Sequence, residues 1–270
     1  MAGRVALVVA AVLALGACTT TPTGPAALRV MTWNVETHAH DPADWAPVIA
    51  DLHPDLLALQ EICAGEADEL AALLAREHGL TYRVVPAPIR PPTPAEAHAP
   101  VNAALGPACG TGPDDVQYGL AVLSRLPVTD PVVVTYPPDH RDEQRGYLRL
   151  QVTTASGVAV TVHDTHLGLD GVATDQVRRL AADADDADDA AGTAPAVVLG
   201  DLNLGADAPE LAPLRAGLAE VDPHGRLPTT ADGAIDHVFL RGLHVVGVPQ
   251  TPDVTASDHR PLVVDLQVGG

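Results

Sequence analysis

The sequence contains no lysine, and acidic residues far outnumber basic ones. All 15 cationic side chains are arginines, against 35 carboxylates, so the formal net charge at neutral pH is −20. Such a surface repels polyanions at long range, and non-specific binding to duplex DNA normally needs several Lys or Arg contacts to phosphates. The composition therefore argues against a protein that binds DNA avidly.

Aromatic residues are also scarce, and long hydrophobic runs are missing. The chain has one Phe, two Trp and four Tyr, yet 47% of its 270 residues are hydrophobic. A core built from Val, Leu and Ala is therefore expected, large enough for one substantial domain. The apolar run 5–15 is too short for a typical membrane-spanning helix, and we find no internal repeat.

The N-terminus has the features of a targeting segment. Arg4 precedes the apolar run, and Leu15-Gly16-Ala17-Cys18 resembles a bacterial lipobox, in which the cysteine is lipidated after cleavage. We expect a lipoprotein signal peptide and lipobox over 1–18 and a flexible tether over 19–27. The protein would then be exported and held at the outer face of the bacterial cell membrane through Cys18. The alternative is an ordinary secretory peptide with an incidental cysteine.

Two further cysteines lie in the remaining chain, Cys63 and Cys109. An even pair in an exported domain favours a disulfide, and the alternative is two buried thiols. The bridge would tie the segment after Glu61 to a Pro-rich stretch, 86–113, that has no clear period. That stretch is predicted to be a long loop, which either shapes a binding cleft or is a disordered insertion.

Strands outnumber helices in the expected secondary structure. Helices are expected at 42–52, 66–78 and 170–190, and the acidic run 183–189 is interpreted as a solvated helix end. Strands are expected at 28–35, 55–61, 117–124, 128–136, 146–154, 158–166, 196–201, 234–240, 243–248 and 261–268. Helices at these intervals can cover both outer faces of two packed sheets, mixed or antiparallel. The sequence therefore predicts one four-layer α/β/β/α sandwich.

Polar residues recur where these strands end. Asn34, Glu61, His166, Asp201 and Asp236 all occupy such positions. Their recurrence indicates a site assembled along one rim of the sheets.

Seven short motifs, weak singly, occur in a specific order. They are Thr32-Trp33-Asn34-Val35, Leu59-Gln60-Glu61, Tyr118 to Arg125, Thr165-His166-Leu167, Gly200-Asp201-Leu202-Asn203, Ile235 to Phe239 and Ser257-Asp258-His259-Arg260-Pro261. The series resembles the endonuclease/exonuclease/phosphatase superfamily, which includes pancreatic-type deoxyribonucleases, abasic-site endonucleases, bacterial sphingomyelinases and inositol-phosphate phosphatases. The resemblance spans Leu28 to Leu266 and implies that 28–270 is a catalytic domain.

The resemblance implies a divalent cation, Mg²⁺ or else Mn²⁺ or Ca²⁺. Glu61 offers a hard oxygen for such an ion. By resemblance Glu61 is the main metal ligand, with Asn34 and Asp258 nearby. Bound cations would also change the local field, so the acidic surface does not exclude catalysis on a phosphodiester.

Acid–base and phosphate-binding roles also follow from the resemblance. Asp201 is assigned to the nucleophilic water or a metal, and Asn203 to phosphate; two residues apart on an extended segment, they project to one side. Imidazole titrates near neutrality, so His259 is the favoured acid–base residue, oriented by Asp236. It either activates the water or holds the scissile phosphate.

Three further residues complete the predicted site. His166 contacts phosphate or protonates the leaving group by resemblance, Tyr118 hydrogen-bonds near the phosphate, and Arg145 is able to clamp a phosphate through two bonds. Asp164 stands where relatives often carry Asn, and its charge is expected to disfavour phosphate or to raise the pKa of His166. The other histidines, including His38, His40, His98 and His237, receive no role.

The sequence thus predicts a monomeric, metal-dependent phosphoester hydrolase at the cell envelope, with a phosphodiesterase or nuclease activity. Sphingomyelinase-like or small-molecule phosphatase action on a phospholipid, inositol phosphate or other small phosphoester is the first alternative. Scarce aromatics leave little to build a membrane-docking hairpin. A non-catalytic lipid-anchored binding protein is the second alternative.

Overall fold

The computed structural model describes residues 28–90, 109, 117–137, 143–169, 171–186 and 194–269. The predicted signal peptide, Cys18 and the tether lie outside these residues, as does most of the predicted loop. No helix within the described ranges has the length and apolar character needed to cross a membrane.

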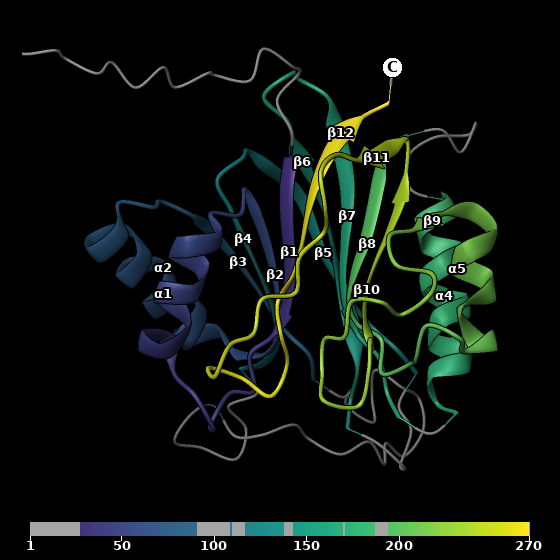
Figure 1. The fold of residues 1–270 in the computed structure, drawn as a ribbon, viewed down its shortest axis with the longest axis horizontal. Helices are drawn as coiled ribbons and strands as arrows, with labels where there is room; N and C mark the ends of the chain where they lie inside the picture. Colours follow the sequence, from purple (N-terminus) through teal and green to yellow (C-terminus); the bar gives the residue numbers. More distant parts are fainter. Residues whose placement is uncertain are drawn as a thin grey trace, which may run out of the picture.

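Two six-stranded sheets pack face to face between two layers of helices (Figure 1). The first sheet has the order β11-β12-β1-β2-β4-β3 and the second β5-β6-β7-β8-β10-β9. Both are mixed, because β1 and β2 run parallel, as do β7 and β8, while their other neighbours are antiparallel. The predicted four-layer sandwich is confirmed.

The strands of the first sheet are β1 (Leu28–Asn34), β2 (Leu56–Cys63), β3 (Arg83–Pro88), β4 (Tyr118–Ser124), β11 (Leu243–Val245) and β12 (Leu262–Val268). Those of the second are β5 (Val128–Thr135), β6 (Gly146–Thr153), β7 (Ala159–His166), β8 (Ala196–Asp201), β9 (Ala219–Glu220) and β10 (Asp236–Arg241). The helices are α1 (Pro42–Leu52), α2 (Ala64–His78), α4 (Ala173–Asp186), α5 (Ala212–Gly217) and the short 3₁₀ helix η1 (Pro209–Leu211).

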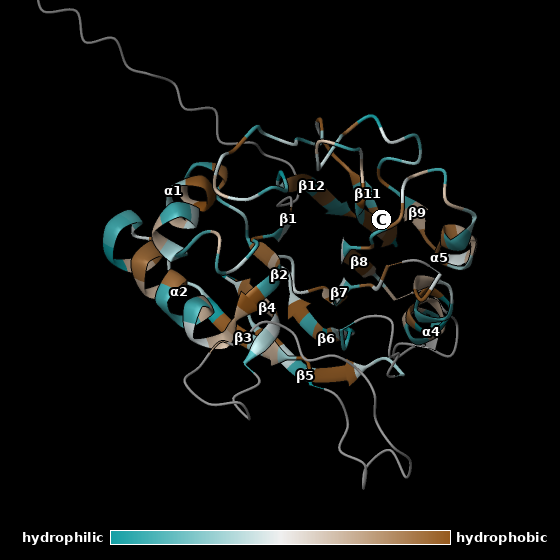
Figure 2. Ribbon diagram, turned by 90° about the horizontal axis from the view of Figure 1, so that it is seen from below, coloured by the Kyte–Doolittle hydropathy of each residue, from teal (hydrophilic) through white to brown (hydrophobic). Residues whose placement is uncertain are grey.

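Three hydrophobic clusters hold the four layers together. The largest lies between the sheets and consists mainly of Val and Leu, as the composition predicts. A second packs α1 and α2 on the first sheet and buries both tryptophans, and a third packs α4 and α5 on the second sheet around Phe239. In Figure 2, where the fold is seen from below, the strands between the helical layers carry many hydrophobic segments, and the helices carry both hydrophobic and hydrophilic ones. Burial of apolar surface on both faces of each sheet is the main stabilising term.

Two segments differ from the predicted elements. The predicted loop 86–113 begins too early, since Pro86 and Pro88 belong to β3, and β3 is an edge strand, where a missing N–H is tolerated. The acidic run is not simply solvated, because Asp183 on α4 contacts His163 and Arg149 of the second sheet. The short elements η1, α5 and β9 carry too little periodicity for detection from sequence.

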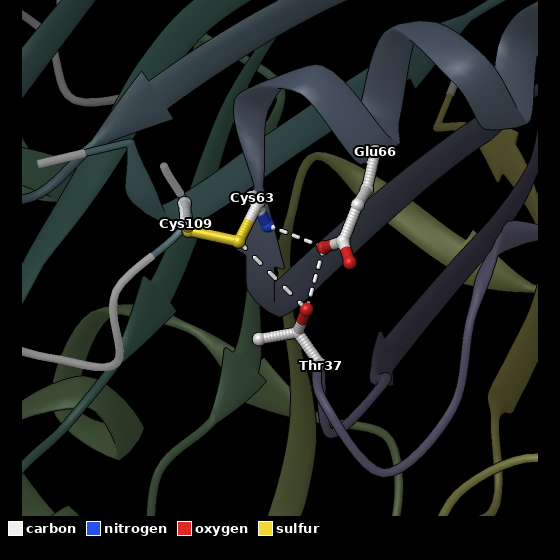
Figure 3. Close-up of a disulfide and its surroundings, with 4 residues drawn as sticks. All are labelled: Thr37, Cys63, Glu66 and Cys109. Atoms are coloured by element: carbon white, nitrogen blue, oxygen red, sulfur yellow. Dashed lines mark hydrogen bonds between the residues drawn. A yellow bond between two sulfur atoms is a disulfide. The ribbon is translucent and has the colours of Figure 1, made fainter. Parts of the chain in front are cut away.

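The predicted disulfide is present between Cys63 and Cys109 (Figure 3). Cys63 closes β2 and is the N-cap of α2, where Glu66 accepts hydrogen bonds from the Cys63 amide and the Thr37 hydroxyl. The bridge joins residues 46 positions apart. It therefore fastens Cys109 to the chain only two residues after Glu61.

Candidate active site

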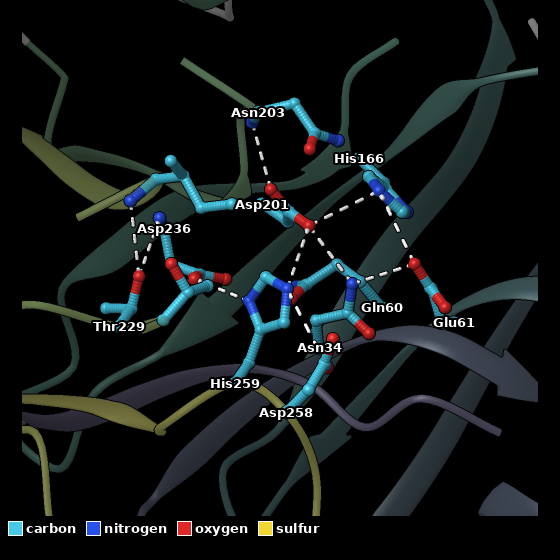
Figure 4. Close-up of polar contacts among 12 residues, drawn as sticks. Asn34, Gln60, Glu61, His166, Asp201, Asn203, Thr229, Asp236, Asp258 and His259 are labelled. Atoms are coloured by element: carbon cyan, nitrogen blue, oxygen red, sulfur yellow. Dashed lines mark hydrogen bonds and ion pairs between the residues drawn. The ribbon is translucent and has the colours of Figure 1, made fainter. Parts of the chain in front are cut away.

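The polar strand ends predicted to meet do meet (Figure 4). Asn34 pairs in register with Gln60 at the ends of β1 and β2, and His166 pairs with Asp201 at the ends of β7 and β8. Asp236 starts the antiparallel strand β10 opposite Asp201. Because both sheets end at the same rim, the two sets of side chains face each other there.

Gly200 allows β8 to deliver Asp201 to this rim. Its φ is 144°, and a Cβ placed on it would lie 1.9 Å from the Thr165 carbonyl oxygen of β7. No side chain fits in that space. The glycine of the Gly-Asp-Leu-Asn motif is therefore required by the close approach of two backbones.

Two of the candidate residues adopt the left-handed backbone conformation. Glu61 has φ 54° and lies in a β-bulge, where the register between β2 and β4 shifts; Asn203 has φ 51°. Bulges redirect side chains and are frequent beside active sites, and backbone strain of this kind is concentrated at functional sites. The bulge turns the Glu61 carboxylate toward Asn34.

Asn34 links the two carboxylates at the centre of the site. Its Nδ2 donates to Glu61 Oε1 at 2.9 Å and to Asp201 Oδ2 at 3.0 Å. Asp201 is fully buried, and burial together with the charge of Asp236 raises the pKa of its carboxyl, while His259, Asn34 and Asn203 act in the opposite direction. A nearby positive charge would favour the ionised form.

The donor set around Asp201 suits a hard divalent cation. One atom each of Glu61, His166 and Asp201 lies within 4.8 Å of the others, and so do atoms of Asp201, Asp236 and His259. The first group offers two carboxylates, the ligand type that Mg²⁺, Mn²⁺ and Ca²⁺ favour. In the second, the imidazole already engages Asp236. Glu61 and Asp201 are therefore the residues best placed to hold a metal.

His259 is oriented by Asp236. Its Nδ1 lies 2.8 Å from Asp236 Oδ2, which leaves Nε2 facing Asp201 Oδ2 at 3.8 Å. Thr229 fixes Asp236 in turn, since its hydroxyl accepts from the Asp236 amide. Burial alone would lower the pKa of His259, but the hydrogen bond and charge of Asp236, with the charges of Asp201 and Asp258, raise it to about 9.

In the metal-free protein, we expect the His259 ring to titrate near pH 9. The imidazolium therefore persists through neutral pH and is lost as pH rises through that value. Asp236→Asn removes the strongest contact that raises the pKa, so the midpoint should fall by about 1 to 3 pH units. NMR titration of the ring protons with EDTA present measures it. Asp258→Asn is the control, and an equal shift there would contradict a specific pairing.

His166 and Arg145 form a second group beside the carboxylates. Arg145 Nη1 lies 2.7 Å from His166 Nδ1, and His166 Nε2 lies 3.4 Å from Asp201 Oδ2. Burial, followed by the charges of Arg145 and His259, holds the pKa of His166 well below its ordinary value. Arg145 is almost buried and also pairs with Glu143 at 2.6 Å. An imidazole with a lowered pKa beside a guanidinium can position phosphoryl oxygens. It is a poor general acid near neutral pH, because little of it is protonated and able to donate to a leaving group.

Tyr118 is buried next to this group. Burial and the charges of Glu61 and Glu143 raise the pKa of its hydroxyl. The hydroxyl therefore keeps its proton, and a hydrogen bond with Glu61 contributes to the shift. The contact of Tyr118 near the phosphate stays a prediction.

The expected effect of Asp164 on His166 is wrong. Asp164 is fully buried between the sheets, where burial raises the pKa of its carboxyl well above the ordinary value although Gln60 donates to it at 2.7 Å. Asp164 is not among the groups that shift the pKa of His166, which is lowered by burial and by the charges of Arg145 and His259. The Gln60 contact across the sheets was not foreseen, although Gln60 lies in the Leu-Gln-Glu motif.

Asp258 and Asn203 lie at the edge of the group. The Asp258 side chain is 66% exposed and 4.0 Å from His259 Nε2, and its amide donates to Glu36. The structure therefore places Asp258 by His259 and not in the cluster of Glu61. Asn203 donates from its amide to Asp201 Oδ1 and from Nδ2 to the Leu167 carbonyl.

Comparisons with known proteins agree with this geometry. Residues 31–259 match the model of the "Endonuclease/Exonuclease/phosphatase family". A protein of that description from Beutenbergia cavernae is 25% identical with a TM-score of 0.68, over 91% of this chain and 72% of the other. No curated protein matches.

Two more distant structures share the fold. The human Nocturnin catalytic domain, with a bound sulfate anion, is 18% identical with a TM-score of 0.64, over 90% of this chain and 94% of the other. D. rerio TDP2, complexed with a single-strand DNA product, is 17% identical with a TM-score of 0.65, over 90% of this chain and 99% of the other. The similarity thus covers both sheets and the rim where the polar residues meet.

Proposed function

Because this chain belongs to the endonuclease/exonuclease/phosphatase family, whose members hydrolyse phosphoesters, we propose that it is a metal-dependent phosphodiesterase. One observation carries the proposal: Asn34 joins the carboxylates of Glu61 and Asp201, and His259 faces the same Asp201 oxygen while Asp236 holds its other nitrogen. Phosphoester hydrolysis needs an activated water, charge relief at the phosphoryl group and help for the leaving group. The site contains side chains suited to each.

Asp201 and His259 are assigned to the attacking water. The 3.8 Å between Asp201 Oδ2 and His259 Nε2 is too long for a direct hydrogen bond, so both atoms are available to a water. A cation held beside Asp201 would lower the pKa of the His259 ring from its metal-free value. Neutral Nε2 then takes the proton of that water, and Asp236 stabilises the imidazolium that forms. This arrangement follows the logic of hydrolytic triads.

Charge relief is assigned to a divalent cation and to the neighbouring donors. Glu61 and Asp201 would hold the ion. Asn34 donates to both carboxylates, and the exposed Asp258 lies 4.0 Å from His259 Nε2. When bound, the ion supplies Lewis-acid polarisation of a phosphoryl oxygen. Arg145, His166, Tyr118 and Asn203 are assigned to the remaining phosphoryl oxygens.

The charge distribution favours a substrate with little negative charge beyond the scissile phosphate. Two exposed carboxylates, Glu36 and Asp258, lie at the mouth of the site, and the chain carries a net charge of −20. Small diesters, phospholipid headgroups and short single strands meet this requirement better than duplex DNA does.

A substrate panel with the purified full-length protein tests the function. Bis-p-nitrophenyl phosphate should be hydrolysed with Mg²⁺, Mn²⁺ or Ca²⁺ and not with EDTA, and p-nitrophenyl phosphate should react far more slowly. Sphingomyelin vesicles, inositol phosphates, single-stranded DNA and duplex DNA, assayed in parallel, separate the lipid, small-molecule and nuclease alternatives. No turnover of any diester under all three metals would refute the proposal and favour a binding protein.

We also propose that the protein is exported as a lipoprotein and acts as a monomer at the outer face of the cell membrane. The lipobox-like segment ending at Cys18 supports the anchor. Mass spectrometry of the mature N-terminus tests the lipid anchor. A mature chain that begins with an unmodified residue other than Cys18 would exclude the anchor.

A further inference from the structure

A buried charged cluster lies behind the active site, on the opposite face of β10. It consists of Glu220 and His237, whose side chains are buried, and of Arg215, whose side chain is 31% exposed. Successive strand residues point to opposite faces, so Asp236 faces the active site while His237 faces the helices of the second sheet, next to Phe239. The side chains of Glu220 and His237 are each only 2% exposed. Charged groups are rarely buried so completely without a specific set of partners.

The partners of His237 are both hydrogen-bond acceptors. Its Nδ1 lies 2.9 Å from Glu220 Oε1, and its Nε2 lies 2.7 Å from the carbonyl oxygen of Leu204. A carbonyl cannot donate, and Glu220 is a carboxylate that also accepts from Arg215 Nε at 2.7 Å. Both ring nitrogens therefore face acceptors, and each contact is a hydrogen bond only where that nitrogen carries hydrogen.

The cluster holds the segment that follows Asn203. His237 donates to the carbonyl of Leu204, and Arg215 donates to the carbonyl of Ala206. Both side chains contact the same carboxylate, Glu220. The backbone carbonyls of Leu204 and Ala206 are thus both hydrogen-bonded to side chains that contact Glu220.

Asn203 depends on such a restraint. Its φ of 51° is a left-handed conformation, which Asn adopts more readily than most residues but which contacts with the surroundings must still select. Only in this conformation do its amide and side chain make their contacts with Asp201 Oδ1 and the Leu167 carbonyl. If the carbonyl of Leu204 were released, Asn203 could relax to an ordinary conformation and leave the site.

We propose that Glu220, His237 and Arg215 form a positioning cluster that fixes the backbone after Asn203 and so places Asn203 for phosphate binding. The inference rests on the proposed phosphodiesterase function for its catalytic meaning. The three residues act through Asn203 and touch no reacting atom. β10 then supports the site from both faces, with Asp236 orienting His259 and His237 orienting the Asn203 segment.

His237→Gln tests the proposal, because the two N–H groups of a glutamine amide are on one nitrogen and cannot replace the two separate ring nitrogens. With bis-p-nitrophenyl phosphate we expect kcat/KM to fall by about 10- to 100-fold, the loss that a displacement of about 1 Å causes. In the Asn203→Ala background, His237→Gln should lower kcat/KM by less than about threefold, because the residue that it positions is already gone. An equal loss in both backgrounds overturns the proposal, as does no loss in either.

His163→Gln is the matched control. His163 is also fully buried against a carboxylate, with Nε2 3.0 Å from Asp183 Oδ2, but that contact joins β7 to α4 and not to Asn203. Its loss should lower the melting temperature and leave kcat/KM within about threefold of wild type. If His237→Gln does not fold, Glu220→Gln removes the shared carboxylate and is tested in the same two backgrounds.

Hydrogen exchange of the Asn203 amide gives a readout that needs no activity. This N–H is bonded to Asp201 Oδ1, so its exchange should accelerate by about tenfold or more in His237→Gln and not in His163→Gln. If wild type hydrolyses no diester, the proposed function fails, while the exchange rates still decide on the cluster. Unchanged exchange in His237→Gln overturns the positioning role.

Discussion

Replacing His259 with alanine should lower kcat on bis-p-nitrophenyl phosphate by about 10²- to 10⁴-fold, the usual contribution of a general acid or base. The ring has Asp236 on Nδ1 at 2.8 Å and presents Nε2 toward Asp201. Alanine removes the group that accepts the water's proton and also leaves the Asp236 carboxylate without that partner. Initial rates at saturating Mg²⁺ measure the loss.

His244→Ala serves as the matched control for this substitution. His244 lies on the edge strand β11, is exposed, and its ring lies 3.1 Å from Gln267 Oε1 and makes no hydrogen bond with a residue of the proposed site among the described residues. Its loss should leave kcat within about twofold of wild type, as surface substitutions usually do. Comparable rates for His259→Ala and His244→Ala would show that His259 takes no part in the reaction.

The layered fold was predictable because the sequence signals agree with one another. Valine- and leucine-rich runs alternate with amphipathic helices, and in the structure both faces of each sheet are covered. The rim of polar strand ends was predictable for the same reason, since it needs only the end of each strand. The sequence therefore predicted which side chains meet at the rim without any knowledge of strand pairing. They are Asn34, Glu61, His166, Asp201 and Asp236.

The features that could not be predicted from the sequence depend on strand pairing and on burial. The left-handed conformation of Glu61 arises from a register shift between β2 and β4, and no local motif encodes it. The raised pKa of Asp164 follows from complete burial between two sheets. His237 received no role because its partners, Glu220 and Leu204, lie 17 and 33 residues away.

Glu61→Gln should raise the Mg²⁺ concentration needed for half-maximal activity by at least about 10- to 100-fold, the range that loss of a supporting contact alone produces at metal sites. Glutamine keeps the length of the side chain and an oxygen for Asn34 Nδ2, which donates to Glu61 Oε1 at 2.9 Å. The negative charge, which a hard cation needs most, is lost. Metal titrations of the initial rate, with Mg²⁺ and Mn²⁺ in turn, measure the shift.

Glu77→Gln separates this effect from a general loss of surface charge. Glu77 is an exposed residue of α2 that pairs with Arg76, and its neutralisation changes the net charge by the same amount. Its metal dependence should match wild type, because exposed charges beyond about 10 Å are largely screened at 0.1 M salt. An unchanged Mg²⁺ requirement in Glu61→Gln would show that Glu61 is not a ligand of the ion. The second cluster, Asp201 with Asp236 and His259, would then be the better candidate for the metal, and His259 could no longer serve as the base.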